Sequence, residues 1–393
     1  MNATNTQQQL VYLPYLNLGS DEEISIGPVR IWNFDLKKND YIPDLQLREY
    51  IEQLIWTNTT ARTRRGKFPA LEGIGIVSLG PTDFRQFTAN ENAAITRARS
   101  ALFLACLAKN AYARRNSNAG FSIYTSENFR AVTQNFVLGS PFIAETAGLI
   151  VSTTDMGLEL GKVHFPKPSY VHIPRGAAYD TDLLDGFAST RRYSRDLRNR
   201  LFSATAILLE SYYNNPYVHI SARVLLQAAA LEMLLQSQNR EDFKNKIERY
   251  LNDKGTIRGK PKRESRYRYR SERSRPKNGQ RAYADEVRSI KGMWADRFFT
   301  LRNHVIHGEN VRRREYVFRR QQDHVLIAPL VFVALMREIL NEASVARGKG
   351  RVCSGELLWA RSDDEDEPNL RRFRLTKHTY WHPAKKHGLK VDE

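Results

Sequence analysis

Residues Trp294–Gly308 have the sequence WADRFFTLRNHVIHG, and this stretch decides the fold of the C-terminal half of the chain. Large apolar residues recur in it at positions i, i+4, i+7 and i+11, a spacing that forms a continuous apolar stripe along a helix. The stripe consists of Trp294, Phe298, Leu301 and Val305. We expect it to face the core of a helical bundle, with Gly308 ending the helix.

The polar residues of the same helix lie on other faces. Asn303 and His307 are four residues apart and share one side. At about 100° per residue, that side is nearly opposite the apolar stripe. Phe299 and Ile306 lie beside it, and an exposed apolar pair next to polar groups predicts a protein–protein surface such as a dimer interface. Arg302 lies on the flank between the stripe and this second surface.

The segment Leu301–Gly308, LRNHVIHG, resembles the R-x4-6-H signature of HEPN domains. With an asparagine after the arginine and a glycine after the histidine, it is most similar to the Apea-like HEPN group. The upstream segment Ala228–Leu235, AAALEMLL, resembles the helix of that group that contains Ala-Leu-Glu. The resemblance covers residues 195–345 and implies an all-α HEPN bundle there. It also implies an enzyme that cuts RNA without a metal or other cofactor, leaves a 2′,3′-cyclic phosphate, and works as a homodimer with two motifs facing each other.

The residue types of the motif suit that chemistry. The nucleophile is the 2′-hydroxyl of RNA, which needs a general base, and the leaving 5′-oxygen needs a general acid. His307 suits either role, because imidazole titrates near neutral pH. Arg302 suits the charge that builds on the phosphate, and Asn303 would orient the phosphate or His307. One histidine per chain is too few for both roles, which favours a symmetric dimer.

Glu232 is the remaining catalytic candidate. It lies in a stripe with Leu225, Ala228 and Leu235, an apolar setting in which a carboxylate needs a partner. Arg302 is the partner we expect, and a carboxylate on the helix surface is the alternative. His304 lies off the face of Asn303, so we expect it to be structural or exposed rather than catalytic.

The pattern along the chain predicts an α+β protein. A mixed α/β domain at 1–185 would sense a trigger, regulate the second domain or bind a protein partner. The HEPN-like helical bundle would follow at 190–347, and a charged tail at 348–393. Strands are expected within 10–18, 24–34, 74–79 and 129–154, and helices at 44–56, 93–114, 197–213, 218–236, 242–251, 282–307 and 323–346.

The bundle contains a basic insertion at 254–281. It has almost no aliphatic residues, so we expect it to bury no core and to be mobile. Its single-sign charge and interleaved tyrosines favour contact with RNA, such as tRNA or mRNA, over a merely solvated loop. The expected RNA-binding residues are Arg258, Lys260, Lys262, Arg263, Arg266, Tyr267, Arg268, Tyr269 and Arg270 in the insertion, and Arg312, Arg313 and Arg314 after the motif.

The composition supports a polyanionic partner and a cytoplasmic location. The formal net charge is +18 over 393 residues, for which nucleic acid is the simplest reason. Two cysteines far apart in sequence exclude a disulfide framework and fit a reducing compartment. The N-terminus is polar, so we expect no signal peptide, and the apolar run Val325–Met336 is too short to cross a bilayer. The tail histidines, His378, His382 and His387, lack cysteine or carboxylate companions, so we expect no metal site.

Two classes of function follow from these observations. The first is a metal-independent endoribonuclease of the HEPN type, acting as a homodimer in bacterial antiphage defence or a toxin system. The alternative is a non-catalytic HEPN subunit that binds nucleic acid or acts as a scaffold within a larger defence complex. RNA cleavage that depends on His307 separates the two.

Overall fold

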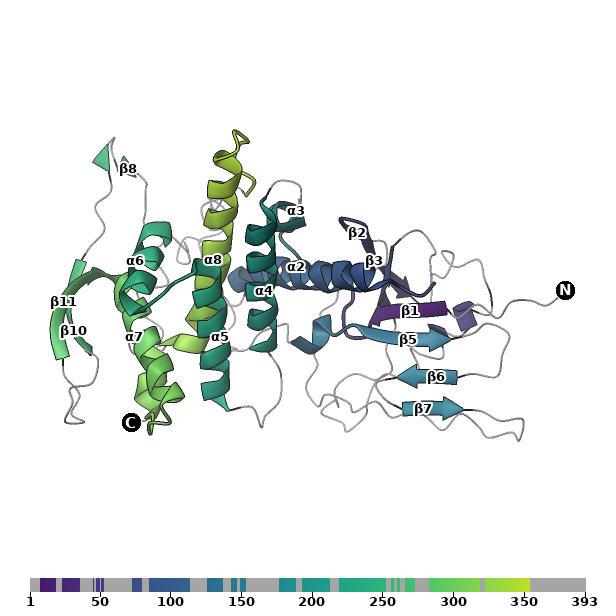
Figure 1. Ribbon diagram of the computed structural model, residues 1–393, viewed down its shortest axis with the longest axis horizontal. Helices are drawn as coiled ribbons and strands as arrows, with labels where there is room; N and C mark the ends of the chain where they lie inside the picture. Colours follow the sequence, from purple (N-terminus) through teal and green to yellow (C-terminus); the bar gives the residue numbers. More distant parts are fainter. Residues whose placement is uncertain are drawn as a thin grey trace. The chain divides into compact units, whose positions relative to one another are not determined.

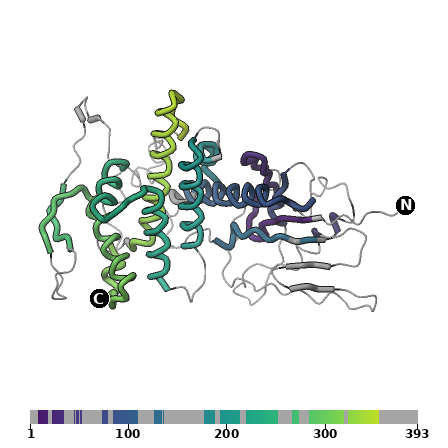
Figure 2. Tube along the Cα trace, in the orientation of Figure 1, coloured from purple at the N-terminus to yellow at the C-terminus, as the bar shows by residue number. Residues whose placement is uncertain are grey.

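The computed structural model of the chain has two compact units (Figures 1 and 2). The first lies within 1–191 and includes Tyr212, and the second lies within 192–211 and 218–393. The structure describes residues 8–18, 23–35, 45, 47–49, 51–52, 73–79, 85–113, 126–136, 143–146, 149–152, 177–188, 193–212, 219–251, 256–257, 260–261, 266–272, 283–318 and 322–353.

The first unit contains a seven-stranded antiparallel sheet in the order β2-β3-β4-β1-β5-β6-β7. Its strands are β1 Gln8–Leu13, β2 Glu23–Ile26, β3 Val29–Asp35, β4 Gly73–Ser78, β5 Val132–Phe136, β6 Ile143–Thr146 and β7 Leu149–Ser152. The central strand β1 pairs with β4 through Tyr12 and Ile76 and with β5 through Leu10 and Gln134. All seven strands lie within or at the edges of the four segments in which the sequence predicts strands.

Among the helices that the structure describes in this unit, α2 Ala89–Ala113 and α3 Thr181–Ala188 contact each other. Thr88 and Glu91 form a reciprocal cap at the start of α2. The Thr88 backbone N–H donates to Glu91 Oε2 at 2.8 Å, and the Glu91 backbone N–H donates to Thr88 Oγ1 at 3.3 Å. Hydrogen bonds from Arg85 first, and then from Thr88, lower the pKa of Glu91 to about 2. The α2 cap therefore stays charged across the physiological pH range.

Within the described residues of the second unit, five α-helices pack as a bundle. They are α4 Arg195–Glu210, α5 Ile220–Leu235, α6 Arg240–Leu251, α7 Ile290–Ile306 and α8 His324–Val345. α5 contacts α4, α6, α7 and α8, and α6 contacts α7 and α8. Trp294, Phe298 and Leu301 of the predicted stripe are buried, and the rings of Trp294 and Phe298 stack at 5.1 Å. Val305 is half-buried, so the stripe faces the core over most of its length.

The central helix α8 contains a proline, and a side chain of the neighbouring helix α5 replaces the hydrogen bond that this proline cannot form. Pro329 has no backbone N–H, so the Val325 carbonyl loses its usual donor within the helix. Gln227 of α5 supplies the missing hydrogen bond, with 3.1 Å between its Nε2 and the Val325 oxygen. Among the described helices, α8 alone is long and apolar enough to cross a membrane, but most of it is buried inside this unit, as expected of a core helix.

The second unit is not purely helical, so the prediction of an all-α bundle is wrong, although the coarser α+β class is confirmed. β10 Arg266–Glu272 and β11 Tyr283–Ser289 form an antiparallel hairpin that packs on α7. Short pairs are added by β8 Thr256–Ile257 with β9 Lys260–Pro261 and by β12 Val317–Phe318 with β13 Gln322–Asp323. The helix expected from residue 282 begins only at Ile290, where Ser289 Oγ accepts from the Gly292 N–H at 3.1 Å.

Part of the basic insertion is therefore ordered, contrary to the prediction that it has nothing to pack. In β10, Tyr269 and Ser271 are buried, whereas Arg266, Arg268 and Arg270 are exposed. Buried ionic groups replace the missing aliphatic core. Asp296 of α7 binds Arg240 at 2.8 Å and Lys244 at 3.2 Å, and Lys244 also binds Glu286 of β11 at 3.0 Å. Residues 254–255, 258–259, 262–265 and 273–281 of the insertion lie outside the described residues.

Lys244 holds its charge inside this network. Burial lowers the pKa of Lys244, but the carboxylates of Glu241, Asp296 and Glu286 outweigh burial and leave the pKa above its ordinary value. A buried lysine with three acidic partners stays protonated, so the network joins α6, α7 and β11 permanently at neutral pH.

A buried histidine makes the stability of this unit sensitive to acid. His324 packs against Phe298 at 5.7 Å and Phe318 at 5.8 Å, and burial, then the charge of Arg297, lower its pKa from 6.5 to about 3. The His324 imidazole binds a proton near pH 6.5 in the unfolded chain but only near pH 3 in the folded chain. The free energy of unfolding therefore falls by about 1.4 kcal/mol per pH unit across that window.

We expect His324→Phe to remove this contribution while keeping a ring against Phe298. Between pH 7 and pH 5, the wild type should lose about 2 kcal/mol more than the variant in urea unfolding. Parallel losses in the two proteins would show that His324 does not carry the acid sensitivity.

Candidate functional site

Helices α5 and α7 contact each other and bring Glu232 to Arg302. Arg302 Nη2 donates to Glu232 Oε2 at 3.2 Å, the contact that the sequence predicts for this carboxylate. Arg302 Nη1 donates to Asn303 Oδ1 at 2.9 Å, and the guanidinium lies over the Phe299 ring at 5.3 Å from its centroid. The arginine is therefore held by a carboxylate, an amide and a ring, in one orientation.

This arrangement leaves hydrogen-bond donors for a ligand. Because Asn303 Oδ1 accepts from Arg302, its Nδ2 is left as a donor of two hydrogen bonds. The guanidinium has five N–H groups, of which the two contacts to Glu232 and Asn303 use two. Donors on adjacent residues of one helix suit the oxygens of a phosphate.

The Glu232 carboxylate is held in an unfavourable setting. Its Oε1 is buried without a hydrogen-bond partner among the described residues. Burial raises the pKa of Glu232 above its ordinary value, and Arg302 opposes this only in part. A carboxylate that is costly to bury and is aimed at one arginine indicates that the arginine's position matters more here than stability.

His307 ends α7, one turn beyond Asn303, and is exposed. Gly308 follows with φ +66°, a left-handed conformation that turns the chain away. The Glu309 N–H then closes the turn on the His304 carbonyl at 2.9 Å. No hydrogen bond joins the His307 imidazole to another residue that the structure describes, so the ring is accessible to a ligand or to a second chain.

Of the two apolar residues predicted to be exposed beside this face, Phe299 and Ile306, only Ile306 is exposed. Phe299 packs against Phe243 of α6 at 5.7 Å and beneath Arg302, so it is not an exposed contact residue. Ile306 is 49% exposed, and Met233, which follows Glu232, is 37% exposed. The exposed apolar residues next in sequence to the site residues are therefore Ile306 and Met233, and α5 contributes a residue that helical spacing on α7 alone could not identify.

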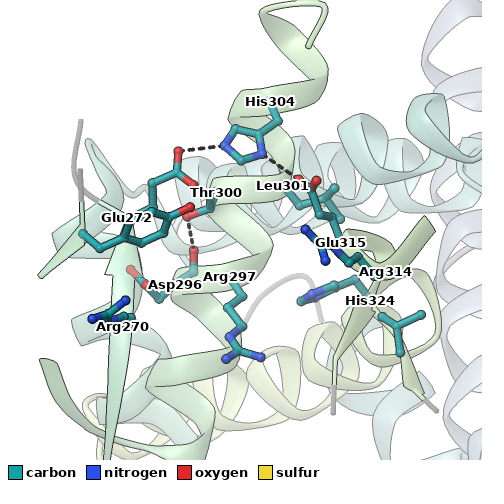
Figure 3. Close-up of a pocket in the computed structure, with 12 residues that line it drawn as sticks. Arg270, Glu272, Asp296, Arg297, Thr300, Leu301, His304, Arg314, Glu315 and His324 are labelled. Carbon is teal, nitrogen blue, oxygen red and sulfur yellow. Dashed lines mark hydrogen bonds and ion pairs between the residues drawn. The ribbon is translucent and has the colours of Figure 1, made fainter. Parts of the chain in front are cut away.

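His304, one turn before the helix end, is buried and has a structural role, as expected. Its Nε2 lies 2.9 Å from Glu272 Oε1 and its Nδ1 lies 3.1 Å from Glu315 Oε2 (Figure 3). Glu272 ends β10, and Glu315 belongs to the short helix η3 Arg313–Tyr316. His304 therefore connects both segments to α7, a role that no local sequence motif predicts.

A cavity of about 340 Å³ opens beside His304. It is lined by residues of β10, β11, α7, η3, β12 and the start of α8. Figure 3 shows Arg270 on one side of it, Arg314 and His324 on the other, and Arg297 between them. Only Arg270 and Arg314 of these residues are among the RNA-binding candidates from the sequence.

The RNA-binding candidates from the sequence, Arg270 and Arg314 included, differ in burial and in whether the structure describes them. Tyr269 is only 7% exposed and its hydroxyl lies 3.3 Å from Glu286, so it packs inside the unit and the predicted stacking on a base is wrong for this residue. Burial, and then the charges of Asp296 and Glu286, raise its pKa. Arg258, Lys262 and Arg263 lie outside the described residues, and Lys260 lies in β9. The exposed arginines are Arg266, Arg268, Arg270, Arg312, Arg313 and Arg314, and Tyr267 is half-exposed.

Two of the exposed arginines have acidic partners. Arg268 binds Asp285 at 2.9 Å and Arg313 binds Asp323 at 3.1 Å. Both pairs are solvent-exposed and therefore weak, so an RNA phosphate can compete for them. In the part of the chain that the structure describes, no group of three or more histidine, cysteine, aspartate or glutamate side chains is arranged to hold a metal ion.

In comparisons with known protein families, with characterised proteins and with solved structures, nothing matches this chain.

Proposed function

We propose that the chain is a metal-independent endoribonuclease of the HEPN type, with its site on α7. The observation that carries the proposal is the chain of contacts from Glu232 through Arg302 to Asn303, which ends one turn from the exposed His307. A fixed cation, an amide donor and an accessible imidazole are the groups that phosphodiester cleavage by a 2′-hydroxyl requires.

In the proposed reaction, the RNA 2′-oxygen attacks the adjacent phosphorus and the bond from phosphorus to the 5′-oxygen breaks. A base takes the 2′-hydroxyl proton and an acid returns a proton to the leaving 5′-oxygen, giving a 2′,3′-cyclic phosphate and a 5′-hydroxyl. His307 performs one of these transfers. Arg302 and the Asn303 amide bind the non-bridging oxygens, where negative charge builds. DNA lacks the nucleophile and is not cut.

A second copy of the chain supplies the second imidazole in this proposal. Ile306 precedes His307 and Met233 follows Glu232, and their exposure supports a self-complementary contact near the site. Two sites facing each other across such a contact place one His307 on each side of the phosphate.

Ile306→Glu is expected to weaken the dimer about 100-fold and to reduce cleavage in parallel, because a carboxylate would enter the apolar contact. Val345→Glu is the matched control, since Val345 is 55% exposed at the far end of α8. Sedimentation measures the association and labelled RNA measures the activity. A wild type that stays monomeric at every concentration while cutting RNA would exclude the facing-site mechanism.

Glu232 should act by positioning Arg302. Glu232→Gln keeps an oxygen that accepts from Arg302 but removes the buried charge, whose cost is present only above the raised pKa of this carboxyl. We expect the variant to be at least as stable as the wild type at pH 7 and to cut RNA nearly as fast. Glu232→Ala should cut about tenfold more slowly, because the guanidinium loses its anchor. Equal losses in both variants would mean that the carboxylate takes part directly.

The direct test incubates the full chain with end-labelled RNA in EDTA and identifies the product ends. Cyclic phosphate termini support the proposal, and arrested growth on expression would support a role in defence or as a toxin in the cytoplasm.

One observation favours a second candidate, a non-catalytic RNA-binding subunit of a larger complex. Arg266, Arg268 and Arg270 are all exposed along β10, and such a basic row can bind phosphates whether or not the RNA is cut. Tight RNA binding without any cleavage would select that candidate.

A further inference from the structure

The arginine-lined cavity lies along the same face of α7 as His307. Thr300, which lines it, is seven residues before His307, and His304 is three residues before it. Seven residues make two helical turns, so Thr300 and His307 differ by only about 20° around the axis and by about 10 Å along it. A strand whose phosphate is held at His307 would therefore continue over the cavity.

The charges around the cavity favour an anionic ligand. Its three carboxylates each have a cationic or imidazole partner: Asp296 binds Arg240 and Lys244, and Glu272 and Glu315 bind His304. By contrast, Arg270 and Arg314 are exposed and form no ion pair with another described residue. Guanidinium groups arriving from two separate segments, β10 and η3, can converge on one phosphate.

Two further features favour a nucleotide over a bare phosphate. Tyr283 of β11 lies at the cavity with 52% of its surface exposed, so its ring is available to stack on a base. A volume of about 340 Å³ accommodates one nucleotide.

We propose that this cavity is a subsite for one nucleotide of the RNA strand, next to the nucleotide that is cut at His307. Arg270 and Arg314 bind its phosphate, and Tyr283 stacks on its base. The proposal rests on the ribonuclease function proposed above, and it assigns to the cavity the choice of where along the strand the enzyme cuts.

The test measures binding without cleavage. A labelled RNA pentamer carrying 2′-O-methyl groups has no nucleophile, so its Kd for the full chain is independent of catalysis. Arg270→Ala, Arg314→Ala and Tyr283→Ala are each expected to raise the Kd about tenfold. Arg249→Ala removes the same charge from an α6 side chain that is 65% exposed, and should change the Kd by less than about threefold. All four positions are exposed, and urea midpoints check that each variant folds.

Two results would overturn the subsite. If Arg249→Ala weakens binding as much as Arg314→Ala, the effect is general charge attraction, because Arg249 lies on α6 and does not line the cavity. If nucleoside 5′-monophosphates bind in an Arg314-dependent way while pentamer binding ignores the substitutions, the cavity serves free nucleotides.

The two proposals fail separately. Suppose that cleavage needs His307, but the three cavity substitutions change neither its rate nor the Kd of the pentamer. That result would exclude the subsite and leave the ribonuclease function standing. Cavity-dependent binding of the pentamer by a chain that never cuts RNA leaves the subsite standing and removes the ribonuclease.

Discussion

Replacing His307 with alanine is expected to lower the rate of metal-independent RNA cleavage by about 100-fold or more, because general acid–base catalysis contributes on that scale. His307 is exposed at the end of α7 and forms no hydrogen bond through its ring to another described residue, so its removal should cost little stability. The rate is measured with end-labelled RNA in EDTA under single-turnover conditions. The urea midpoint, measured on the same preparation, should stay at the wild-type value.

His378→Ala is the matched control, since this histidine belongs to the charged tail, outside the described residues, where the sequence predicts a solvated chain. A His307→Ala protein that cuts RNA as fast as the wild type would falsify the assignment of the site. Mixing His307→Ala with Arg302→Ala chains adds a sharper test. If the site needs one motif from each copy, the mixture should show a rate that differs from the average of the two parents.

Replacing Asp296 with alanine is expected to lower the free energy of unfolding by about 3–5 kcal/mol. The Asp296 side chain is only 2% exposed and receives Arg240 at 2.8 Å and Lys244 at 3.2 Å. Its removal leaves cationic groups in a buried setting with fewer counter-charges, which is the costly way to break a buried ion pair. The loss should also detach the β10–β11 hairpin, because Lys244 and Tyr269 both link that hairpin to Asp296.

Asp285→Ala is the comparison, because Asp285 forms an exposed pair with Arg268 at 2.9 Å and should contribute less than about 1 kcal/mol. Urea unfolding gives both values, and amide hydrogen exchange in 283–289 shows whether the hairpin opens first. Similar small losses in the two variants would mean that the buried network adds nothing to stability.

Helical spacing was enough to predict the core face of α7, because the regular 3.6-residue repeat fixes directions before any tertiary contact is known. Trp294 and Phe298 are accordingly buried where the pattern puts them. The contact between Glu232 and Arg302 was one of two alternatives, and it was favoured only because a carboxylate in an apolar setting needs a partner.

The hairpin could not be predicted in the same way. Arg266–Glu272 has no aliphatic residues, and its inward side becomes apparent only when Asp296 and Lys244 are placed beneath it by other helices. For the same reason, the sequence could not show that Tyr269 is buried and that its ring is not available to stack on an RNA base. His304 depends on carboxylates from β10 and η3, whose approach is a property of the fold and not of any local spacing.

The pairing of Pro329 with Gln227 has an evolutionary consequence. The amide of Gln227 compensates for a hydrogen bond that the proline at position 329 removes, so we expect the two residues to be selected together. A replacement at position 329 that restores the backbone N–H would displace the glutamine amide and leave a buried polar group without a partner. In an alignment of homologous chains, positions 227 and 329 should therefore covary, and their covariation would record the register between the helix that carries Glu232 and the helix at the centre of the bundle.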